Sequence, residues 1–211
     1  MHNKELKIPE AAINRISVYS RYLTELENSD MTHISSVELA EGTGGNSAQV
    51  RKDLAYFGEF GVRGVGYNIR TLNHEIKRIL GLERPWNVIL VGAGNMGKAL
   101  SQYVGFKDRG FNMLAAFDND IDKVGLMLNG VPVYAINQLE DFIEKNDVDI
   151  AMITVPADYA QDVADVLADT RIKGILNFAP VMLNVANGIE VRNVDLAVNL
   201  EILTYNIEAK K

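Results

Sequence analysis

The chain has 211 residues, enough for one large domain or two smaller ones, and its hydrophobic and charged fractions of 47% and 23% are ordinary for a globular protein. It contains no cysteine, which excludes disulfides, thiolate nucleophiles and cysteine metal sites, and no apolar run approaches the roughly 18 residues that span a bilayer. Because the N-terminal segment also lacks the apolar core of a secretory signal, we expect a cytoplasmic protein that does not enter a membrane.

The formal net charge of −7 alone argues against a nucleic-acid partner, but the charges are unevenly distributed. Residues 1–84 contain 11 basic and 11 acidic side chains, whereas residues 85–211 contain 10 and 17. Within the first part, residues 46–78 carry six basic side chains against three acidic ones. A surface for an acidic partner is therefore expected in this stretch.

The first two predicted helices are marked by periodicity and by a capping box. Apolar residues recur at spacings of three and four from Pro9 to Leu26, and a proline suits the first helical turn. A second helix begins at Ser35, where Glu38 three residues later completes a capping box. This helix ends at the glycine-rich turn 42–45, which leads into a third helix.

The third helix is predicted from Ala48 to Phe57, with Asn46 or Ser47 as its cap. Its apolar residues share one face, and the opposite face presents small and basic side chains, namely Ala48, Arg51, Lys52 and Ala55. Gln49 has two roles open to it, because it stands where a capping partner of Asn46 would stand and can also bind an adenine edge.

Four glycines among aromatic and branched residues predict a short hairpin over Gly58–Tyr67, with Arg63 near its tip. A further helix follows from Thr71 to Leu80, and Gly81–Trp86 is typical of a linker. The first three helices and the hairpin describe a winged helix-turn-helix domain, which the fourth helix closes, over residues 1–84. The basic side chains on its third helix and hairpin are candidate DNA contacts, with an ordinary solvated face as the alternative: Arg51, Lys52 and Arg63.

From residue 85 to residue 197, short apolar runs alternate with helical patterns. The apolar runs predict buried parallel strands at Val88–Val91, Met113–Phe117, Ile150–Val155 and Ile175–Phe178. Helices are predicted between them at Asn95–Val104, Gln138–Asn146 and Asp158–Thr170, the last opened by an Asp158/Gln161 capping pair. This alternation indicates a doubly wound α/β sheet of the Rossmann type.

The motif Gly92-Ala93-Gly94-Asn95-Met96-Gly97 follows a strand and opens a helix, which is the context that a dinucleotide-binding turn requires. Gly92 permits the tight turn, Gly94 lets the backbone approach a pyrophosphate, and Gly97 lets helix and strand pack closely. Asp118 ends the next strand, where a carboxylate can bind ribose hydroxyls and would repel a 2′-phosphate. The site is therefore predicted to bind NAD(H) rather than NADP(H), with another nucleotide such as coenzyme A, or no ligand, as the alternative.

Two further strand ends place small or polar groups at the same edge of the sheet. Thr154, Val155 and Pro156 end one strand, and Asn177 ends the next. We expect them to contact the ribose and nicotinamide, although strand termination by proline is the simpler explanation of these residues.

Histidine, the commonest proton donor in hydride-transfer enzymes, is missing from this half of the chain. His2, His33 and His74 fall in a terminus, a predicted turn and a helix face, where solvated or structural roles are expected. The sequence also shows no metal-ligand spacing, so no metal is predicted. These absences weaken the case for an enzyme.

The sequence closely resembles the Rex family of redox-sensing transcriptional repressors. The resemblance covers nearly the whole chain, in the segments QVRKDLAYFGEFGVRGVGY (49–67), ILGL (79–82), VGAGNMG (91–97), FDND (117–120), TVP (154–156), GILNFAP (174–180) and NVDLA (193–197). It implies a homodimer whose subunits each pair a winged-helix domain with a Rossmann domain. Such a dimer binds palindromic operator DNA when NADH is scarce and releases it when NADH rises.

The resemblance also implies roles for single residues. Arg51 and Lys52 would contact DNA from the recognition helix, and Arg63 with Gly64 would do so from the wing in the minor groove. Ala48 and Gln49 remain candidate DNA contacts from their positions on the same helix. Asp118 would hold the adenosine ribose. Three residues would couple the cofactor site to the DNA-binding domains: Arg21, Tyr103 and Asp195.

Residues 198–211 are apolar enough to form a helix, which in this family exchanges onto the partner subunit; packing on its own domain is the alternative. The chain departs from the family at Val62, where a basic wing residue is frequent, and at Gly44-Gly45 in the turn. These departures bear on phosphate contacts and on the geometry of the turn.

We therefore predict a DNA-binding repressor that senses NADH, and not an enzyme. Two other functions remain open at this point. An NAD-dependent dehydrogenase with a helical oligomerisation domain would change nicotinamide absorbance in the presence of a substrate. A coenzyme A-binding module would be stabilised by that ligand instead.

Overall fold

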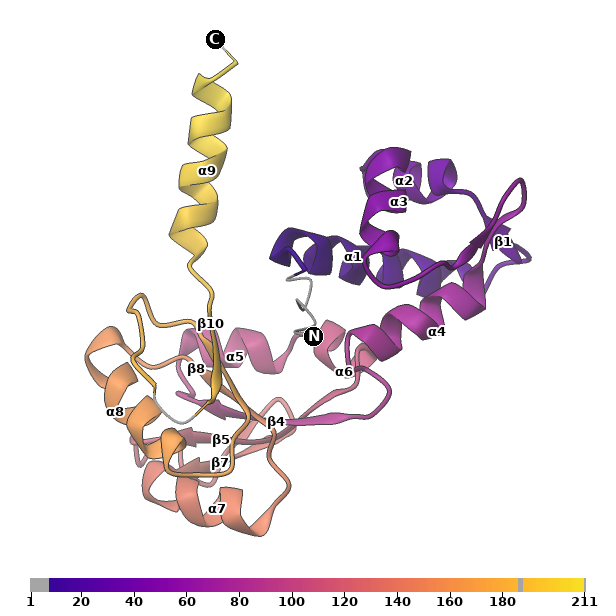
Figure 1. Cartoon of the computed structure of the whole chain (residues 1–211). Helices are drawn as coiled ribbons and strands as arrows, with labels where there is room; N and C mark the ends of the chain where they lie inside the picture. Colours follow the sequence, from indigo (N-terminus) through magenta and orange to yellow (C-terminus); the bar gives the residue numbers. More distant parts are fainter. Residues whose placement is uncertain (1–7, 186–187, 211) are drawn as a thin grey trace, which may run out of the picture. The chain divides into compact units, whose positions relative to one another are not determined.

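The computed structural model describes residues 8–185 and 188–210, and the chain divides into two compact units, residues 1–84 and 85–211 (Figure 1). Each unit has a hydrophobic core of its own. In the described part of the chain, no helix is long and apolar enough to cross a membrane.

The first unit is a winged helix-turn-helix, as predicted. Its described elements are α1 (Glu10–Leu26), β1 (His33–Ile34), α2 (Ser36–Thr43), α3 (Ser47–Ala55), β2 (Gly61–Val62), β3 (Gly66–Asn68) and α4 (Ile69–Ile79). The strands form an antiparallel sheet in the order β1-β3-β2. The hairpin β2–β3 is the predicted wing, whereas β1 was not predicted, and His33 lies in that strand rather than in a turn.

The ends of helices α1 and α3 differ from the predicted ends by one or two residues. Pro9 caps α1 from outside rather than lying in its first turn. Asn46, and not Ser47, caps α3, because its side-chain oxygen accepts a hydrogen bond from the Gln49 N–H at 2.9 Å. The helix ends at Ala55, two residues earlier than expected. On α3, Val50 and Leu54 are buried, and the predicted basic face is exposed.

The capping box of α2 is present as predicted. The Ser35 hydroxyl accepts a hydrogen bond from the Glu38 N–H at 3.1 Å, and the Glu38 carboxylate accepts one from the Ser35 N–H at 2.7 Å. At the other end Gly44 caps the helix with φ of 72°, a left-handed conformation that favours glycine.

We expect Ser35→Ala to lower the free energy of unfolding of the first unit by about 1 kcal/mol, because the change leaves the Glu38 N–H without its cap. Urea denaturation followed by circular dichroism measures this loss. Ser35→Asp is the matched control and should keep most of the stability, because aspartate caps helices as well as serine. Equal losses in both variants would contradict a capping role.

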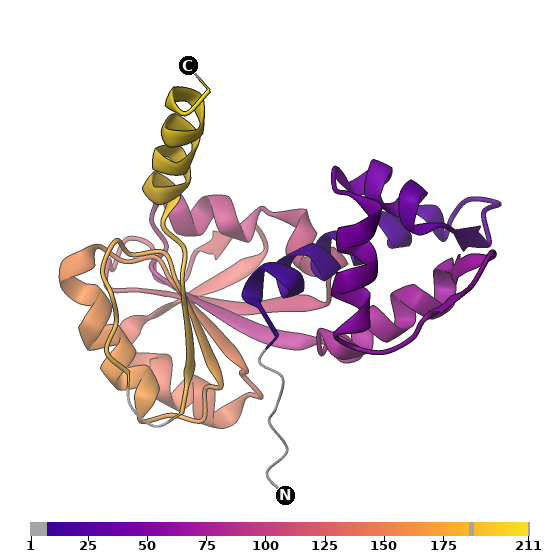
Figure 2. The ribbon, with the colours of Figure 1, turned by 45° about the horizontal axis from the view of Figure 1, so that its top comes forward.

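The second unit is a doubly wound α/β domain built on a seven-stranded sheet with the order β10-β9-β8-β4-β5-β7-β6 (Figure 2). The strands are β4 (Trp86–Val91), β5 (Phe111–Asp118), β6 (Met127–Leu128), β7 (Val131–Ala135), β8 (Ile150–Ile153), β9 (Gly174–Asn177) and β10 (Glu190–Asn193). Only the pair β6–β7 is antiparallel among the described strand pairs of this sheet. The four predicted strands are β4, β5, β8 and β9.

Helices cover both faces of this sheet. They are α5 (Asn95–Ser101), α6 (Val104–Asp108), the 3-10 turn η1 (Ile136–Gln138), α7 (Leu139–Lys145) and α8 (Ala157–Ala168). Figure 2 shows helices on both sides of the sheet. The side chains of β4 alternate between the two faces: Ile89 and Val91 pack with α7 and α8, whereas Val88 and Leu90 pack with the layer that contains α5 and α6. Because strands β4, β5, β7, β8, β9 and β10 are parallel, their carboxyl ends lie at the same edge of the sheet.

Two helix predictions for this unit need correction. The helix expected over residues 95–104 is interrupted at Gln102 and Tyr103, so that α5 and α6 are separate. The predicted Asp158/Gln161 capping pair is absent, because Pro156 stands at the cap of α8. The Gln161 amide instead donates hydrogen bonds to the Asp165 carboxylate at 2.7 Å and to the Asn184 carbonyl at 3.0 Å.

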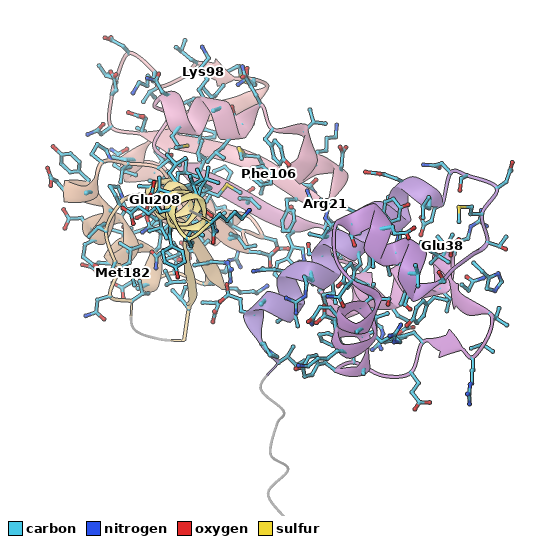
Figure 3. All side chains as sticks on the ribbon, turned by 90° about the horizontal axis from the view of Figure 1, so that it is seen from above. Arg21, Glu38, Lys98, Phe106, Met182 and Glu208 are labelled. Carbon is cyan, nitrogen blue, oxygen red and sulfur yellow. The ribbon has the colours of Figure 1, made fainter. Side chains whose placement is uncertain are left out.

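The last helix, α9 (Leu196–Glu208), has no buried residue among its 13 described positions (Figure 3). The Asp195 carboxylate caps it by accepting hydrogen bonds from the N–H groups of Ala197 and Val198, so it begins two residues before the predicted start. Its large apolar side chains are all exposed: Leu196, Val198, Leu200, Ile202, Leu203, Tyr205 and Ile207.

Candidate nucleotide site and DNA-binding face

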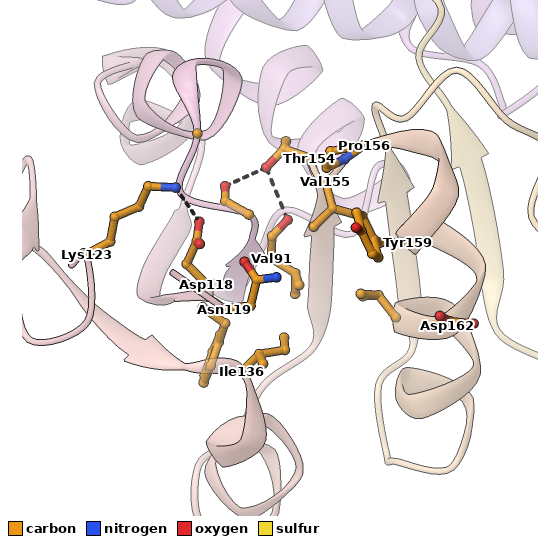
Figure 4. Close-up of a pocket in the computed structure, with 14 residues that line it drawn as sticks. Val91, Asp118, Asn119, Lys123, Ile136, Thr154, Val155, Pro156, Tyr159 and Asp162 are labelled. Atoms are coloured by element: carbon orange, nitrogen blue, oxygen red, sulfur yellow. Dashed lines mark hydrogen bonds and ion pairs between the residues drawn. The ribbon is translucent and has the colours of Figure 1, made fainter. Parts of the chain in front are cut away.

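A cavity of about 450 Å³ opens at the edge of the sheet where β4, β5 and β8 end (Figure 4). Several predicted site residues line it: Gly92, Gly94, Asp118, Thr154, Val155 and Pro156. Others that line it were not predicted, because they come from later loops and helices: Asn119, Lys123, Ile136, Tyr159, Asp162 and Val163. Most of the lining is apolar, and Asp118 and Lys123 lie together on one side of it (Figure 4).

The glycine turn has the geometry that its spacing predicts. Gly92 has φ of 106°, and a Cβ there would lie 2.9 Å from the Thr154 backbone. A Cβ at Gly97 would overlap the Gly92 carbonyl oxygen, so that only glycine lets α5 start this close to β4. Gly94 is exposed with open space around it, which leaves its backbone accessible to a ligand. Asn95 and Met96, also exposed, begin α5 outside the cavity lining.

Asp118 is 8% exposed and is held by three donors. Its Oδ2 accepts hydrogen bonds from the Ala93 N–H at 2.7 Å and from Lys123 Nζ at 3.2 Å, and its Oδ1 accepts one from the Asp120 N–H at 2.9 Å. Burial alone would raise the pKa of Asp118, but these hydrogen bonds and the Lys123 charge lower it. The carboxylate is therefore ionised at neutral pH and faces the cavity.

Thr154 and Asn177 act on the backbone around the cavity. The Thr154 hydroxyl lies 2.7 Å from the Gly92 carbonyl oxygen and 3.1 Å from that of Val91, which ties β8 to the glycine turn. Asn177 is fully buried outside the cavity lining. Its amide nitrogen contacts the carbonyls of Ala179 and Val181 and the Asn193 side chain. These contacts favour a role for Asn177 in holding the loop after β9, rather than the direct cofactor contact that we expected.

In the first unit, three of the predicted DNA-contacting residues, from the recognition helix and the wing, line one hollow of about 580 Å³. Arg51 lines it from α3, and Arg63 and Gly64 line it from the turn between β2 and β3. Ala48 and Lys52 are exposed on the same helix. Val62 is 65% exposed beside Arg63, so the wing carries an exposed apolar side chain next to its cation.

A buried ion pair holds α3 against α1. The Asp53 side chain is fully buried and accepts hydrogen bonds from Arg15 Nε at 2.6 Å and Nη2 at 2.7 Å, and from the Tyr19 hydroxyl at 2.9 Å. Gln49 Nε2 donates to the same carboxylate at 2.7 Å. The Gln49 side-chain amide thus binds a carboxylate within the first unit. This contact is neither the capping interaction nor the adenine contact that were considered for it.

The three predicted coupling residues lie on different elements. Arg21 is exposed on α1. Tyr103 is 56% exposed at the break between α5 and α6, with its ring edge against Phe106 at 4.9 Å between centroids. Asp195 caps α9. Among the described residues, no group of three histidine, aspartate or glutamate side chains could hold a metal ion.

The chain is 54% identical over 208 residues to the redox-sensing transcriptional repressor Rex of Desulfitobacterium hafniense, and the match covers 99% of both chains. It is 55% identical over 204 residues to the protein of the same name from Carboxydothermus hydrogenoformans, covering 97% and 98%. The chain belongs to the Rex family. Family membership confirms the prediction made from the sequence segments.

Solved structures of Rex repressors have the same fold. A Rex-family repressor named RSP, in complex with NAD⁺ and operator DNA, matches with a TM-score of 0.88 at 39% identity, covering 96% of this chain and 94% of that one. The same repressor with NADH matches with a TM-score of 0.85 at 37% identity, covering 97% and 96%. Two family models also match: a putative DNA-binding protein N-terminus over residues 7–55 and a CoA binding domain over residues 83–181.

Proposed function

We propose that this Rex-family chain binds operator DNA through its winged unit and NAD(H) in the cavity of its sheet unit, and that NADH releases it from DNA. The observation that carries the proposal is the combination in one chain of two surfaces. One is the exposed basic face of α3 beside the wing, and the other is a glycine turn whose backbone opens on a cavity. Relatives that match this chain over its full length are named as redox-sensing repressors.

NAD(H) fits the cavity because the ionised Asp118 lies on its wall beside the glycine turn. A carboxylate in this position can accept hydrogen bonds from ribose hydroxyls, and the free N–H groups at the start of α5 suit the pyrophosphate. The repressor that resembles this chain over 96% of its length was solved with NAD⁺ and operator DNA.

DNA binding is assigned to Arg51 and Lys52 on α3 and to Arg63 with Gly64 on the wing. Arginine and lysine contact phosphates and guanine edges, whereas Ala48 is small enough to let α3 approach the bases. Gln49 Nε2 donates to Asp53 on the same helix, and its part is to hold that carboxylate in place for Arg15 and Tyr19 of α1. Because its target is DNA, the protein is assigned to the cytoplasm.

The functional form is a homodimer in which α9 is covered by a partner subunit. Seven large apolar side chains on one exposed helix need such cover, and large exposed apolar patches mark protein interfaces. Two winged units related by a two-fold axis require a palindromic operator, whose half-sites lie about one helical turn or a multiple of it apart. Arg21, Tyr103 and Asp195 link the cofactor to this arrangement.

Operator affinity should fall when NADH is added and respond less to NAD⁺. Because NADH and DNA favour different conformations of the dimer, each lowers the affinity for the other by the same factor, typically about 5–150-fold. Fluorescence anisotropy of a labelled palindromic operator, titrated with each cofactor, measures this coupling. The same operator affinity throughout both titrations would refute the sensor function.

The two other functions considered are separable by experiment. A dehydrogenase would change nicotinamide absorbance when a substrate is supplied, but the relatives that are half identical to this chain are named as repressors, not as enzymes. The description of the CoA binding domain model makes coenzyme A the remaining candidate ligand. A melting temperature raised by coenzyme A, and not by NADH, would favour that ligand.

A further inference from the structure

Among the described residues that line the cavity, Lys123 is the one basic side chain. It lies in the turn that follows β5, and its Nζ is 3.2 Å from Asp118 Oδ2 and 3.4 Å from Asp120 Oδ2. The lysine side chain is 37% exposed, whereas that of Asp118 is 8% exposed. A cation on a flexible, partly solvated stem therefore stands against the carboxylate that is expected to recognise the ribose (Figure 4).

The hydrogen-bonding capacity of Asp118 is almost used up without a ligand. A carboxylate offers about four acceptor positions, and Ala93, Asp120 and Lys123 occupy three of them. A ribose that donates both of its hydroxyls needs two positions. One donor must then give way, and Lys123 is the one at the longest distance and the one whose donor is a flexible side chain rather than a backbone N–H.

We propose that Lys123 determines how strongly the site discriminates between NAD(H) and NADP(H). This inference rests on the proposed function, because it requires the ribose to lie at Asp118. Against NAD(H), the ammonium competes with the ribose for the carboxylate. Toward NADP(H), it supplies a positive charge within reach of the 2′-phosphate and offsets the repulsion from Asp118 and Asp120. Lys123 thus makes the preference for NAD(H) over NADP(H) smaller than Asp118 alone would make it.

The test is Lys123→Ala in the full-length protein, with the dissociation constants for NADH and NADPH measured by calorimetry. We expect NADPH to bind about tenfold more weakly, the size of effect that one partly solvated charge produces at short range, and NADH to bind as well as before or more tightly. Lys123→Arg keeps the charge and should keep the wild-type ratio of the two constants. Lys145→Ala removes an exposed lysine of α7 outside the cavity lining and should change neither constant.

A loss of affinity for NADPH without a loss for NADH separates this role from a structural one. If Lys123 only held the loop in place, Lys123→Ala would weaken both cofactors by a similar factor, and that result would overturn the proposal. An unchanged ratio of the two constants would also overturn it. Wild-type protein that bound neither cofactor would instead refute the nucleotide site itself, so the two failures are distinguishable.

Discussion

Replacing both Arg51 and Lys52 with alanine is expected to weaken operator binding by about 100-fold or more and to leave NADH binding unchanged. Both side chains are exposed on α3, so their removal costs the fold little, whereas DNA phosphates and base edges lose their basic partners. The measurement is anisotropy with a palindromic operator selected by the wild-type protein, repeated over a series of salt concentrations. The slope of log affinity against log salt should flatten by about 0.9 for each phosphate that is no longer neutralised.

The control for this double change is Lys107→Ala with Lys145→Ala, which removes two exposed cations from the sheet unit. It should retain operator affinity to within a few-fold, because the missing charges only alter the net charge. Loss of NADH binding together with DNA binding in the α3 variant would indicate a structural role for the two residues. Unaltered operator binding would place the DNA contacts elsewhere.

Asp53→Ala is expected to destabilise the winged unit by about 3 kcal/mol. The change leaves Arg15 without its partner and removes the acceptor for Tyr19 and Gln49. We expect the lower end of the range for a broken buried ion pair, because the Arg15 side chain is 37% exposed and can be rehydrated. Urea denaturation measures the loss. Glu75→Ala, which breaks an exposed pair with Arg78 on α4, should cost at most about 1 kcal/mol.

The same ion pair should make stability depend on pH in the acid range. Burial alone would raise the pKa of Asp53, but hydrogen bonds from Arg15, Gln49 and Tyr19 lower it below its ordinary value of 3.8. A lowered pKa in the folded state means that the stabilisation is complete above the unfolded value and is lost as the pH falls through the folded one. Asp53→Asn should remove this part of the acid dependence, which denaturation at a series of pH values measures. Retention of the wild-type acid profile after this substitution would contradict the assignment.

Features set by a few neighbouring residues could be predicted from the sequence. The Ser35 capping box and the glycine turn depend on hydrogen bonds and backbone angles within four or five residues, and both occur as predicted. Asn46 is the one of the two proposed caps of α3 that is used, whereas the equally local Asp158/Gln161 pair is absent. The four strands predicted from apolar runs are also present, because strands buried on both faces are apolar throughout.

Features that depend on distant residues could not be predicted in this way. Asp53 looked like one more charge on α3, and only the fold brings Arg15 and Tyr19, more than 30 positions earlier, against it. Lys123 was missed at the cavity because its position relative to Asp118 follows from the turn after β5. The strand β10 was missed because its sequence, EVRN, is polar at the edge of the sheet.

Asn177 shows that a position at a strand end does not by itself determine what a side chain contacts. It does end β9 as predicted, yet its side chain turns into the protein and binds the loop that follows. Residue type and position at a strand end indicate a ligand edge, but they do not determine whether a side chain points outward.

The exposure of helix α9 affects the stability of a subunit that has no partner. A helix of 13 residues without buried positions is marginal in water on its own, and in the proposed homodimer the partner subunit would stabilise it. A subunit that has just been synthesised, or that has dissociated on dilution, would then lack an ordered C-terminal helix. The concentration of functional dimer would then rise more steeply than the total concentration of the chain. Proteolysis would act mainly on subunits that have not yet dimerised.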